Sequence, residues 1–110
     1  MPFLTIYSNS SVADDKLCAD AAQLVARELG KPIQYVVTNL LINQAMAFNG
    51  SLDTKGALIE MKSIGFRDKI SLARVLTDFV AQRLLLDPAY VNIQFVDMSA
   101  HDVAISGCVF

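Results

Sequence analysis

The chain has 110 residues, 54% of them hydrophobic, and its nine basic and eleven acidic residues give a formal net charge of −2. This length fits one domain with a modest core, so we expect a single domain over residues 1–110. The charges are spread along the chain without a basic stripe, which excludes a protein that binds nucleic acid through its phosphates.

The hydrophobic content is high for so small a domain, which has too little interior to bury all of it. We therefore expect an apolar surface that packs against copies of the same chain. The most apolar stretches, residues 33–48 and 72–86, are interrupted by polar residues such as Asn39 and Asp78. Neither supplies the ~18 apolar residues of a membrane span. No secretory signal is visible, so we expect the cytoplasm, with leaderless secretion as the alternative.

Residues 3–7 begin the chain as a strand that is largely apolar on both faces, as in a strand covered on both sides. A turn at residues 8–11 leads into a helix predicted from residue 12 or 13 to residue 29. Gly30 and Pro32 end it. Its apolar residues recur at helical spacing and predict the buried face: Leu17, Ala21, Leu24, Val25 and Leu29.

The next predicted strands are residues 35–41 and 57–64, with a short extended piece at 45–48 between them. A second helix is predicted from residue 67 or 68 to 85, a fourth strand over 90–96, and an extended tail over 103–110. The predicted buried side of the second helix is Ile70, Ala73, Leu76, Val80 and Leu84, widened by Leu72 and Phe79.

The two halves of the chain resemble each other. Pro32 leads into Tyr35-Val36 in the first half, and Pro88 leads into Tyr90-Val91 in the second. This repetition predicts an α+β fold of duplicated β-α-β units, with a four-stranded mixed sheet and both helices on one face. The other face of the sheet is not polar enough for water, so neighbouring subunits are expected to cover it.

Metal and redox sites are not predicted. Cys18 and Cys108 lie far apart in the sequence and lack the spacing of a metal or disulfide-exchange motif. Cys18 falls in the first predicted helix and is interpreted as a small buried hydrophobe. His101 has no second histidine to join it in a zinc site, so a turn or surface role is expected.

Pro2 is the first candidate catalytic residue. If Met1 is removed, Pro2 carries a free secondary amine on a rigid ring. An α-amino group has a pKa near ~8 in water, and burial lowers it toward neutrality. A base with a pKa near the working pH suits proton abstraction next to a carbonyl. The alternative is that Pro2 merely opens the first strand, where its missing N–H costs little.

Several short motifs occur along the chain in a specific order and spacing. They are Met1-Pro2, Leu29-Gly30-Lys31-Pro32 with Tyr35, Met46-Ala47-Phe48 with Gly50-Ser51, Lys62-Ser63-Ile64-Gly65, Arg83-Leu84, and Val91 and Ile93 before Asp97-Met98. No single motif decides an assignment. Together they resemble the macrophage migration inhibitory factor family of the tautomerase superfamily, which includes D-dopachrome tautomerase.

The resemblance implies a homotrimer with active sites between adjacent subunits, and a cofactor-free keto–enol tautomerase of phenylpyruvate-like α-keto acids. It assigns Pro2 as the acid–base catalyst and Lys31 as the residue that holds the substrate carboxylate. The backbone N–H of Ile64, with Ser63 beside it, helps to fix that carboxylate. Tyr35 and Phe110 contribute to an apolar wall. From residue type alone, Lys31 would be a helix C-terminal lysine and Tyr35 a core residue.

Three positions depart from the family's best-known members. Asn92 and Gln94 stand where a tyrosine and an asparagine reach the neighbouring subunit's site, and Ile105 stands at a tryptophan position. Both amides can still donate to an enolate oxygen, but the phenolic donor and aromatic lining are reduced. We therefore expect changed substrate preference or weaker turnover. A Cys-x-x-Cys of some members falls on residues 56–59, so thiol–disulfide exchange is not predicted.

Two other functions compete with the tautomerase. A cytokine-like or host-modulating interaction protein would keep the fold with a vestigial pocket, although an acidic position tied to receptor binding in animal members is Asn43 here. A different proline-based reaction, such as hydration or decarboxylation, ranks last. It usually needs an arginine or glutamate to activate water, and none is evident near the motifs.

Overall fold

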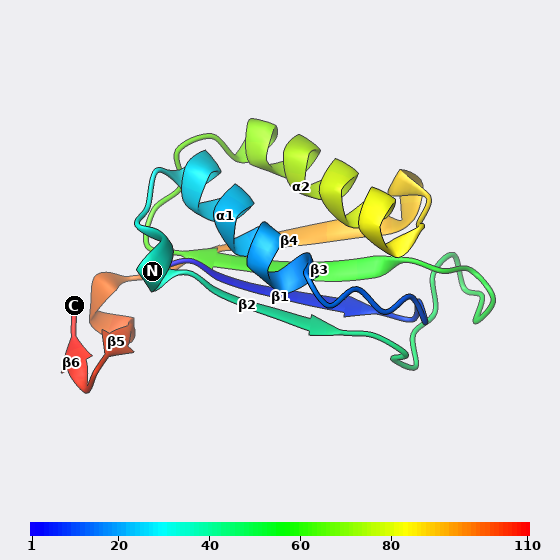
Figure 1. Ribbon diagram of the computed structural model, residues 1–110, viewed down its shortest axis with the longest axis horizontal. Helices are drawn as coiled ribbons and strands as arrows, with labels where there is room; N and C mark the ends of the chain where they lie inside the picture. Colours follow the sequence, from blue (N-terminus) through cyan, green and yellow to red (C-terminus); the bar gives the residue numbers. More distant parts are fainter.

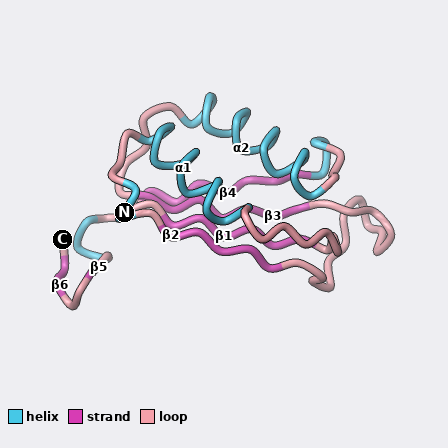
Figure 2. Tube along the Cα trace, viewed as in Figure 1, coloured by secondary structure: helices cyan, strands magenta, loops and turns pink.

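The computed structural model describes all 110 residues and has two layers, with two helices lying across one face of a four-stranded sheet (Figures 1 and 2). This confirms the predicted α+β fold. Short 3-10 helices precede β2 and β4, and a small hairpin ends the chain. The elements are β1 Phe3–Ser8, α1 Leu17–Leu29, η1 Ile33–Tyr35, β2 Val37–Leu41, β3 Ala57–Ser63, α2 Lys69–Leu84, η2 Pro88–Tyr90, β4 Val91–Asp97, η3 Ala100–Asp102, β5 Ala104–Ile105 and β6 Cys108–Val109.

The sheet has the order β2-β1-β3-β4, with β1 and β3 antiparallel at its centre and a parallel strand outside each of them. The two β-α-β units match in register. Phe3 lies opposite Val37 in the first unit, as Ala57 lies opposite Val91 in the second. In the central pair Phe3 faces Lys62, and at the other end Ser8 faces Ala57. The predicted duplication is therefore visible in the strand pairing itself.

The core lies between the sheet and the helices. Alternate residues of the central strands, such as Leu4 and Ile59, point at the helix layer and are at most 1% exposed. Leu17 and Leu76 meet them from α1 and α2. Burying one such side chain stabilises the fold by about 1.5–3 kcal/mol. The predicted buried face of α1 is confirmed in full, and Gly30 ends the helix with a φ of 64°.

The start of α1 differs from the prediction. The helix begins at Leu17, and Asp14 lies before it in a turn, where its side chain accepts the N–H of Lys16. Arg83 of α2 binds the same carboxylate, with Nε 2.6 Å from Oδ2, and this hydrogen bond lowers the pKa of Asp14. The carbonyl oxygen of Asp14 also accepts the N–H of Leu17 at 3.3 Å, so Asp14 forms a turn directly before the helix.

Three further predictions need correction. The second strand begins at Val37, because Tyr35 belongs to η1. The extended tail is a hairpin, since Ser106 and Gly107 both have positive φ and turn β5 back onto β6. Ile70 was predicted to be buried but is 77% exposed, and Leu72 occupies the core in its stead. A helix that starts at Lys69 turns Ile70 toward solvent.

The face of the sheet opposite the helices is uncovered within one chain. Apolar side chains from all four strands lie on it: Val37 and Leu41, Phe3 and Tyr7, Leu58, and Val96. Among them, Val37 is 56% and Leu58 41% exposed. The neighbouring carboxylate of Glu60 raises the pKa of the Tyr7 phenol. Polar and charged residues share this face, among them Glu60, Lys62, Asn92 and Gln94, so the apolar side chains lie exposed between them.

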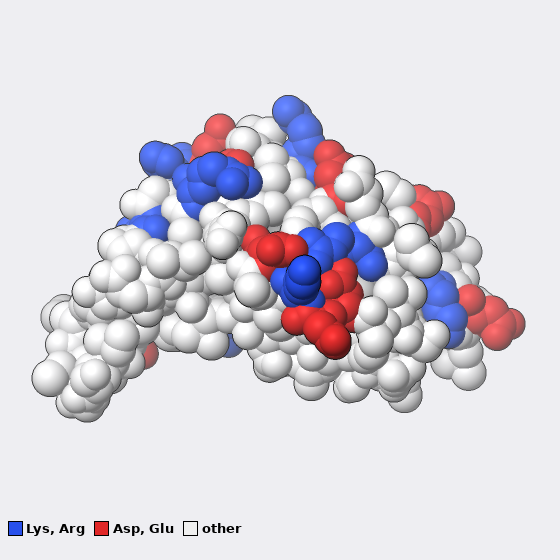
Figure 3. Space-filling model, in the orientation of Figure 1, with Lys and Arg blue, Asp and Glu red and all other residues white.

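Charged side chains gather over the helix layer, where acidic and basic groups alternate (Figure 3). The C-terminal hairpin carries no charge. Neither helix combines the length and apolar character that crossing a lipid bilayer would require.

Candidate active site

Pro2 lies immediately before β1 and is less than 2% exposed. Its carbonyl oxygen accepts the N–H of Val37 at 3.0 Å, so the pairing of β1 with β2 continues to the end of the chain. Alternation along the strand places Pro2 on the same side as Leu4, facing the helix layer. With Met1 attached, the ring nitrogen is a tertiary amide. Removal of Met1 makes it the terminal amine.

The terminal amine lies in a basic and partly dry environment. Burial, and secondly the charge of Lys31, lower the pKa of the Met1 amino group. Lys31 reaches this place from the loop that follows α1, and its Nζ donates to the carbonyl oxygen of Ile64 at 3.3 Å. A lowered amine pKa and a neighbouring ammonium are the two properties expected of a base beside a carboxylate-binding site.

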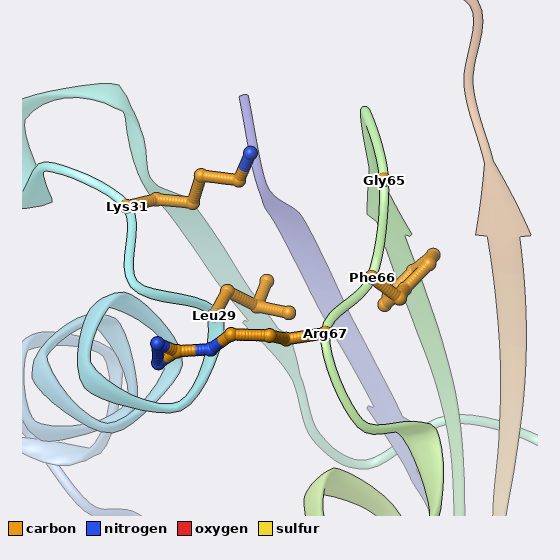
Figure 4. A pocket seen from close by; sticks show the side chains of 5 residues that line it. All are labelled: Leu29, Lys31, Gly65, Phe66 and Arg67. Atoms are coloured by element: carbon orange, nitrogen blue, oxygen red, sulfur yellow. The ribbon is translucent and has the colours of Figure 1, made fainter.

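A cleft of about 260 Å³ opens beside Lys31 and is lined also by Leu29, Gly65, Phe66 and Arg67 (Figure 4). Lys31 extends toward β1, whereas Arg67 extends from the loop after β3 toward the end of α1. The guanidinium lies close to Gly30, where an added Cβ would be 2.9 Å from Nη1. The cleft therefore carries two cations.

Arg67 was not among the residues predicted for the site. One feature of the sequence points to it. A cation directly before the N-cap Asp68 lies at the helix end where the dipole disfavours positive charge.

Ser63 and Ile64 lie at the end of β3, next to Pro2 in the sheet. The register of β1 with β3, extended by one residue, places Pro2 opposite Ser63. Ser63 is completely buried, and its carbonyl oxygen accepts the N–H of Met98 at 2.8 Å. Its hydroxyl has no hydrogen-bond partner. The structure thus brings together four of the predicted site residues: Pro2, Lys31, Ser63 and Ile64.

The predicted apolar wall is formed in part. The rings of Tyr35 and Phe110 meet edge to face, with centroids 6.3 Å apart. The backbone N–H of Phe110 donates to the carbonyl oxygen of Val103, which holds the end of the chain against η3. Ile105 lies in β5 of the same hairpin and is 37% exposed.

Asn92 and Gln94 are not brought to Pro2 within one chain. They lie exposed on the uncovered face of β4, opposite Leu58 and Glu60 respectively. Leu58 in turn faces Tyr7, near the end of β1 that is remote from Pro2. A single chain therefore holds the amine and Lys31, but not the two predicted amide donors.

No group of three or more histidine, cysteine, aspartate or glutamate side chains is arranged to hold a metal ion. Both cysteines are free, and Cys18, predicted to be a small buried hydrophobe in the first helix, lies in α1 but is only half-buried. His101 lies exposed in η3, as expected of a turn residue.

Comparison with known proteins matches the whole chain. The family model for macrophage migration inhibitory factor (MIF) covers residues 1–110. The MIF homolog of Brugia malayi is 33% identical over 115 residues, and the MIF of Meriones unguiculatus is 29% identical over 114; each alignment covers all of this chain and 99% of the relative. The crystal structure of a MIF homologue from Prochlorococcus marinus superposes with a TM-score of 0.92 at 26% identity over 98% of both chains. The chain belongs to the macrophage migration inhibitory factor family of the tautomerase superfamily.

Proposed function

We propose that the protein is a cofactor-free keto–enol tautomerase of phenylpyruvate-like α-keto acids, in which the amine of Pro2, freed by removal of Met1, is the acid–base catalyst. The observation that carries the proposal is the position of the terminal amine. It lies at the buried end of β1, where burial and Lys31 lower its pKa. Once Met1 is removed, the same two causes act on the amine of Pro2.

The proposed reaction moves one proton from carbon to oxygen. The unprotonated ring nitrogen takes a proton from the methylene carbon next to the substrate ketone. The electron pair of that C–H bond forms the carbon–carbon double bond, and the π electron pair of the ketone moves to its oxygen. That oxygen takes a proton from water to give the enol, and the Pro2 ammonium releases the proton it received to water. The reverse reaction returns the proton from the ammonium to carbon. Lys31 holds the substrate carboxylate, and a positioned base of this kind contributes roughly 10²–10⁴-fold to the rate.

A homotrimer would complete the site. The apolar side chains on the outer face of the sheet, such as the exposed Val37 and Leu58, would be covered in an oligomer. Asn92 and Gln94 lie on that same outer side, away from Pro2 of their own chain. We propose that a neighbouring subunit covers the sheet, and that its two amides point at the enolate oxygen formed beside Pro2.

Replacing Pro2 tests the assigned catalyst. Pro2→Gly keeps a residue small enough for removal of Met1 but exchanges the ring amine for a primary amine. We expect kcat/KM for phenylpyruvate tautomerisation to fall by about 10²-fold or more. Mass spectrometry establishes the processing state of each sample, and wild-type protein that retains Met1 should be equally inactive. Unchanged activity in either protein would refute the role of Pro2.

A second function is favoured by the three family positions that differ. Asn92, Gln94 and Ile105 replace aromatic or donor groups that the resemblance assigns to the pocket, which suits an interaction protein with a weak site. Binding to a candidate partner that is equal for wild type and Pro2→Gly, together with tautomerase activity no higher than the uncatalysed rate, would favour this function over the enzyme.

A further inference from the structure

The Ser63 hydroxyl is the one buried side-chain polar group in the structure without a hydrogen-bond partner. Ser63 is fully buried at the end of β3. Buried hydroxyl groups are nearly always hydrogen bonded, and an exception points to a functional role or to a missing partner. The residues around Ser63 indicate which group that partner is.

Two residues flank Ser63 across the sheet: Asp97 of β4 is its partner on one side, and on the other side Pro2 lies just before β1. The antiparallel pairs run from Ser8–Ala57 to Phe3–Lys62, and the next pair in this register is Pro2–Ser63. The carbonyl of Pro2 bonds to Val37 in β2, so Pro2 and Ser63 share no backbone hydrogen bond. Such non-hydrogen-bonded pairs bring their side chains closest, with Cα atoms about 4.5 Å apart. Both side chains face the helix layer, and the proline ring contains the nitrogen.

The second β-α-β unit has a pair at the same register positions, and there a side chain bonds to the backbone nitrogen. The backbone differs in one respect, because Gly56 turns both its N–H and its carbonyl toward β1, whereas the Pro2 carbonyl bonds to β2. One residue beyond Ser8–Ala57, the register places Asn9 opposite Gly56. Asn9 corresponds to Ser63, and Gly56 corresponds to Pro2. The side-chain oxygen Oδ1 of Asn9 accepts the backbone N–H of Gly56 at 2.9 Å in a buried position. In this unit the nitrogen before the central strand is thus bonded by the opposite side chain.

We propose that the Ser63 hydroxyl is the hydrogen-bond partner of the Pro2 ring nitrogen after Met1 is removed, which makes Ser63 a positioning residue for the catalyst. The proposal rests on the function proposed above. An amide nitrogen of proline has neither a hydrogen to donate nor a free lone pair, so the hydroxyl stays unpaired while Met1 is attached. The free amine accepts a hydrogen bond when neutral and donates one when protonated. Serine is shorter than asparagine, so the contact is direct or crosses one water.

The charged groups around the amine are few. Lys31 approaches from the loop after α1, and Arg67 lines the same cleft. Asp97, opposite Ser63 in β4, has Oδ1 bound to the N–H of Gly65. Lys62 points to the other face of the sheet by strand alternation. The hydroxyl of Ser63 therefore favours the protonated amine, whereas the neighbouring Lys31 disfavours it. Its loss should lower the pKa of Pro2, by about 1 unit for one charge-assisted hydrogen bond.

The test is an NMR titration of ¹⁵N-labelled Pro2 in processed protein, together with the pH profile of kcat/KM. Ser63→Ala should lower the pKa of Pro2 by about 1 unit and move the acidic limb of the profile down by the same amount. Ser63→Thr keeps the hydroxyl and should restore both values. Ser8→Ala is the matched control, because Ser8 is an equally buried serine at the other end of the central strands and bonds to Gly56. It should leave the pKa of Pro2 unchanged.

An unchanged pKa of Pro2 in Ser63→Ala would overturn the proposal, whatever the activity. This outcome is distinct from failure of the proposed function, which active Pro2→Gly protein would reveal. A second measurement uses protein that retains Met1. There Ser63→Ala should unfold at the same or a higher temperature than wild type, because it removes an unpaired buried hydroxyl. A clear loss of stability would show that Ser63 already has another partner, and would also overturn the proposal.

Discussion

The two ends of the β1–β3 strand pair have the same topology, but they differ in whether their buried polar groups have hydrogen-bond partners. At the Gly56 end, the backbone N–H of Gly56 is bound by Asn9 and its carbonyl oxygen by the Ser8 hydroxyl at 2.6 Å. Tyr90 and Phe48 pack directly against Gly56. At the Pro2 end, the Ser63 hydroxyl has no partner, and a cleft with Lys31 and Arg67 lies alongside.

This difference shows how a fold built from two similar β-α-β units can have a candidate site in only one of them. The closed end satisfies its buried polar groups and contributes to stability. The open end leaves one such group unpaired, at a cost of about 1–3 kcal/mol, and keeps two cations beside a cavity. Unsatisfied groups of this kind gather where a fold serves a function. In each β-α-β unit the polypeptide enters its central strand at the equivalent place, but only the first unit begins with an amine.

The largest expected effect is on the free energy of unfolding and comes from a substitution at the Gly56 end of the strand pair. A Cβ added at Gly56 would lie 2.5 Å from the carbonyl oxygen of Tyr90 and 2.8 Å from the Phe48 ring. A backbone atom cannot move aside cheaply, so Gly56→Ala should reduce the free energy of unfolding by about 3 kcal/mol, the upper range for overpacking. Urea unfolding followed by circular dichroism measures this loss.

Pro2→Ala is the matched substitution at the open end. It removes two buried ring carbons and should reduce the free energy of unfolding by about 1–2 kcal/mol, less than Gly56→Ala. The comparison of the two ends fails if Gly56→Ala is as stable as wild type, or if the two substitutions cost the same.

The second largest effect is expected for Lys31 and should be seen in KM and in the pH profile of kcat/KM. Lys31→Met keeps the apolar stem but removes the ammonium beside the terminal amine. If Lys31 holds the substrate carboxylate, KM for phenylpyruvate should rise by about 10- to 100-fold. Because Lys31 lowers the pKa of the amine, its removal raises that pKa. The acidic limb of the kcat/KM profile should then move to higher pH, opposite to the shift expected for Ser63→Ala.

Lys16→Met is a suitable control, because Lys16 is exposed at the start of α1, away from the cleft. It should leave both KM and the pH profile unchanged. If the acidic limb of the profile stays in place in Lys31→Met, Lys31 does not affect the pKa of the amine. Burial would then be the sole cause of the lowered pKa.

The fold could be predicted from the sequence because its determinants are local. The spacing of Leu17, Leu24 and Val25 defined the buried face of α1, and Gly30 marked its end. The start of α1 could not be predicted, since Asp14 is held by Arg83, a residue far along the chain. The hairpin of the tail depends on positive φ at Ser106, which serine does not signal.

The site was predicted less completely, and the resemblance to a family supplied most of it. Residue type alone favoured helix-end and core roles for Lys31 and Tyr35. The orphan hydroxyl of Ser63 depends on strand register, and the approach of Arg67 to Gly30 depends on the packing of two loops. Neither is encoded in a local pattern. Asn92 and Gln94 lie exposed on the outer face of β4, away from Pro2 of the same chain.

The smallest effect compares the ends of the two helices. Each helix ends on a residue in the left-handed region, Gly30 with φ 64° and Leu85 with φ 57°. A Cβ in that region costs about 1 kcal/mol, and the Leu85 side chain is 78% exposed, so it recovers little through packing. Leu85→Gly should therefore raise the free energy of unfolding by about 0.5–1 kcal/mol in urea titrations, the remainder being lost to the freedom of glycine in the unfolded chain. Gly30→Ala should lower it by at least as much, since its new Cβ also meets Arg67. A less stable Leu85→Gly protein would mean that Leu85 is covered by something outside this chain, as an exposed leucine in an assembly would be.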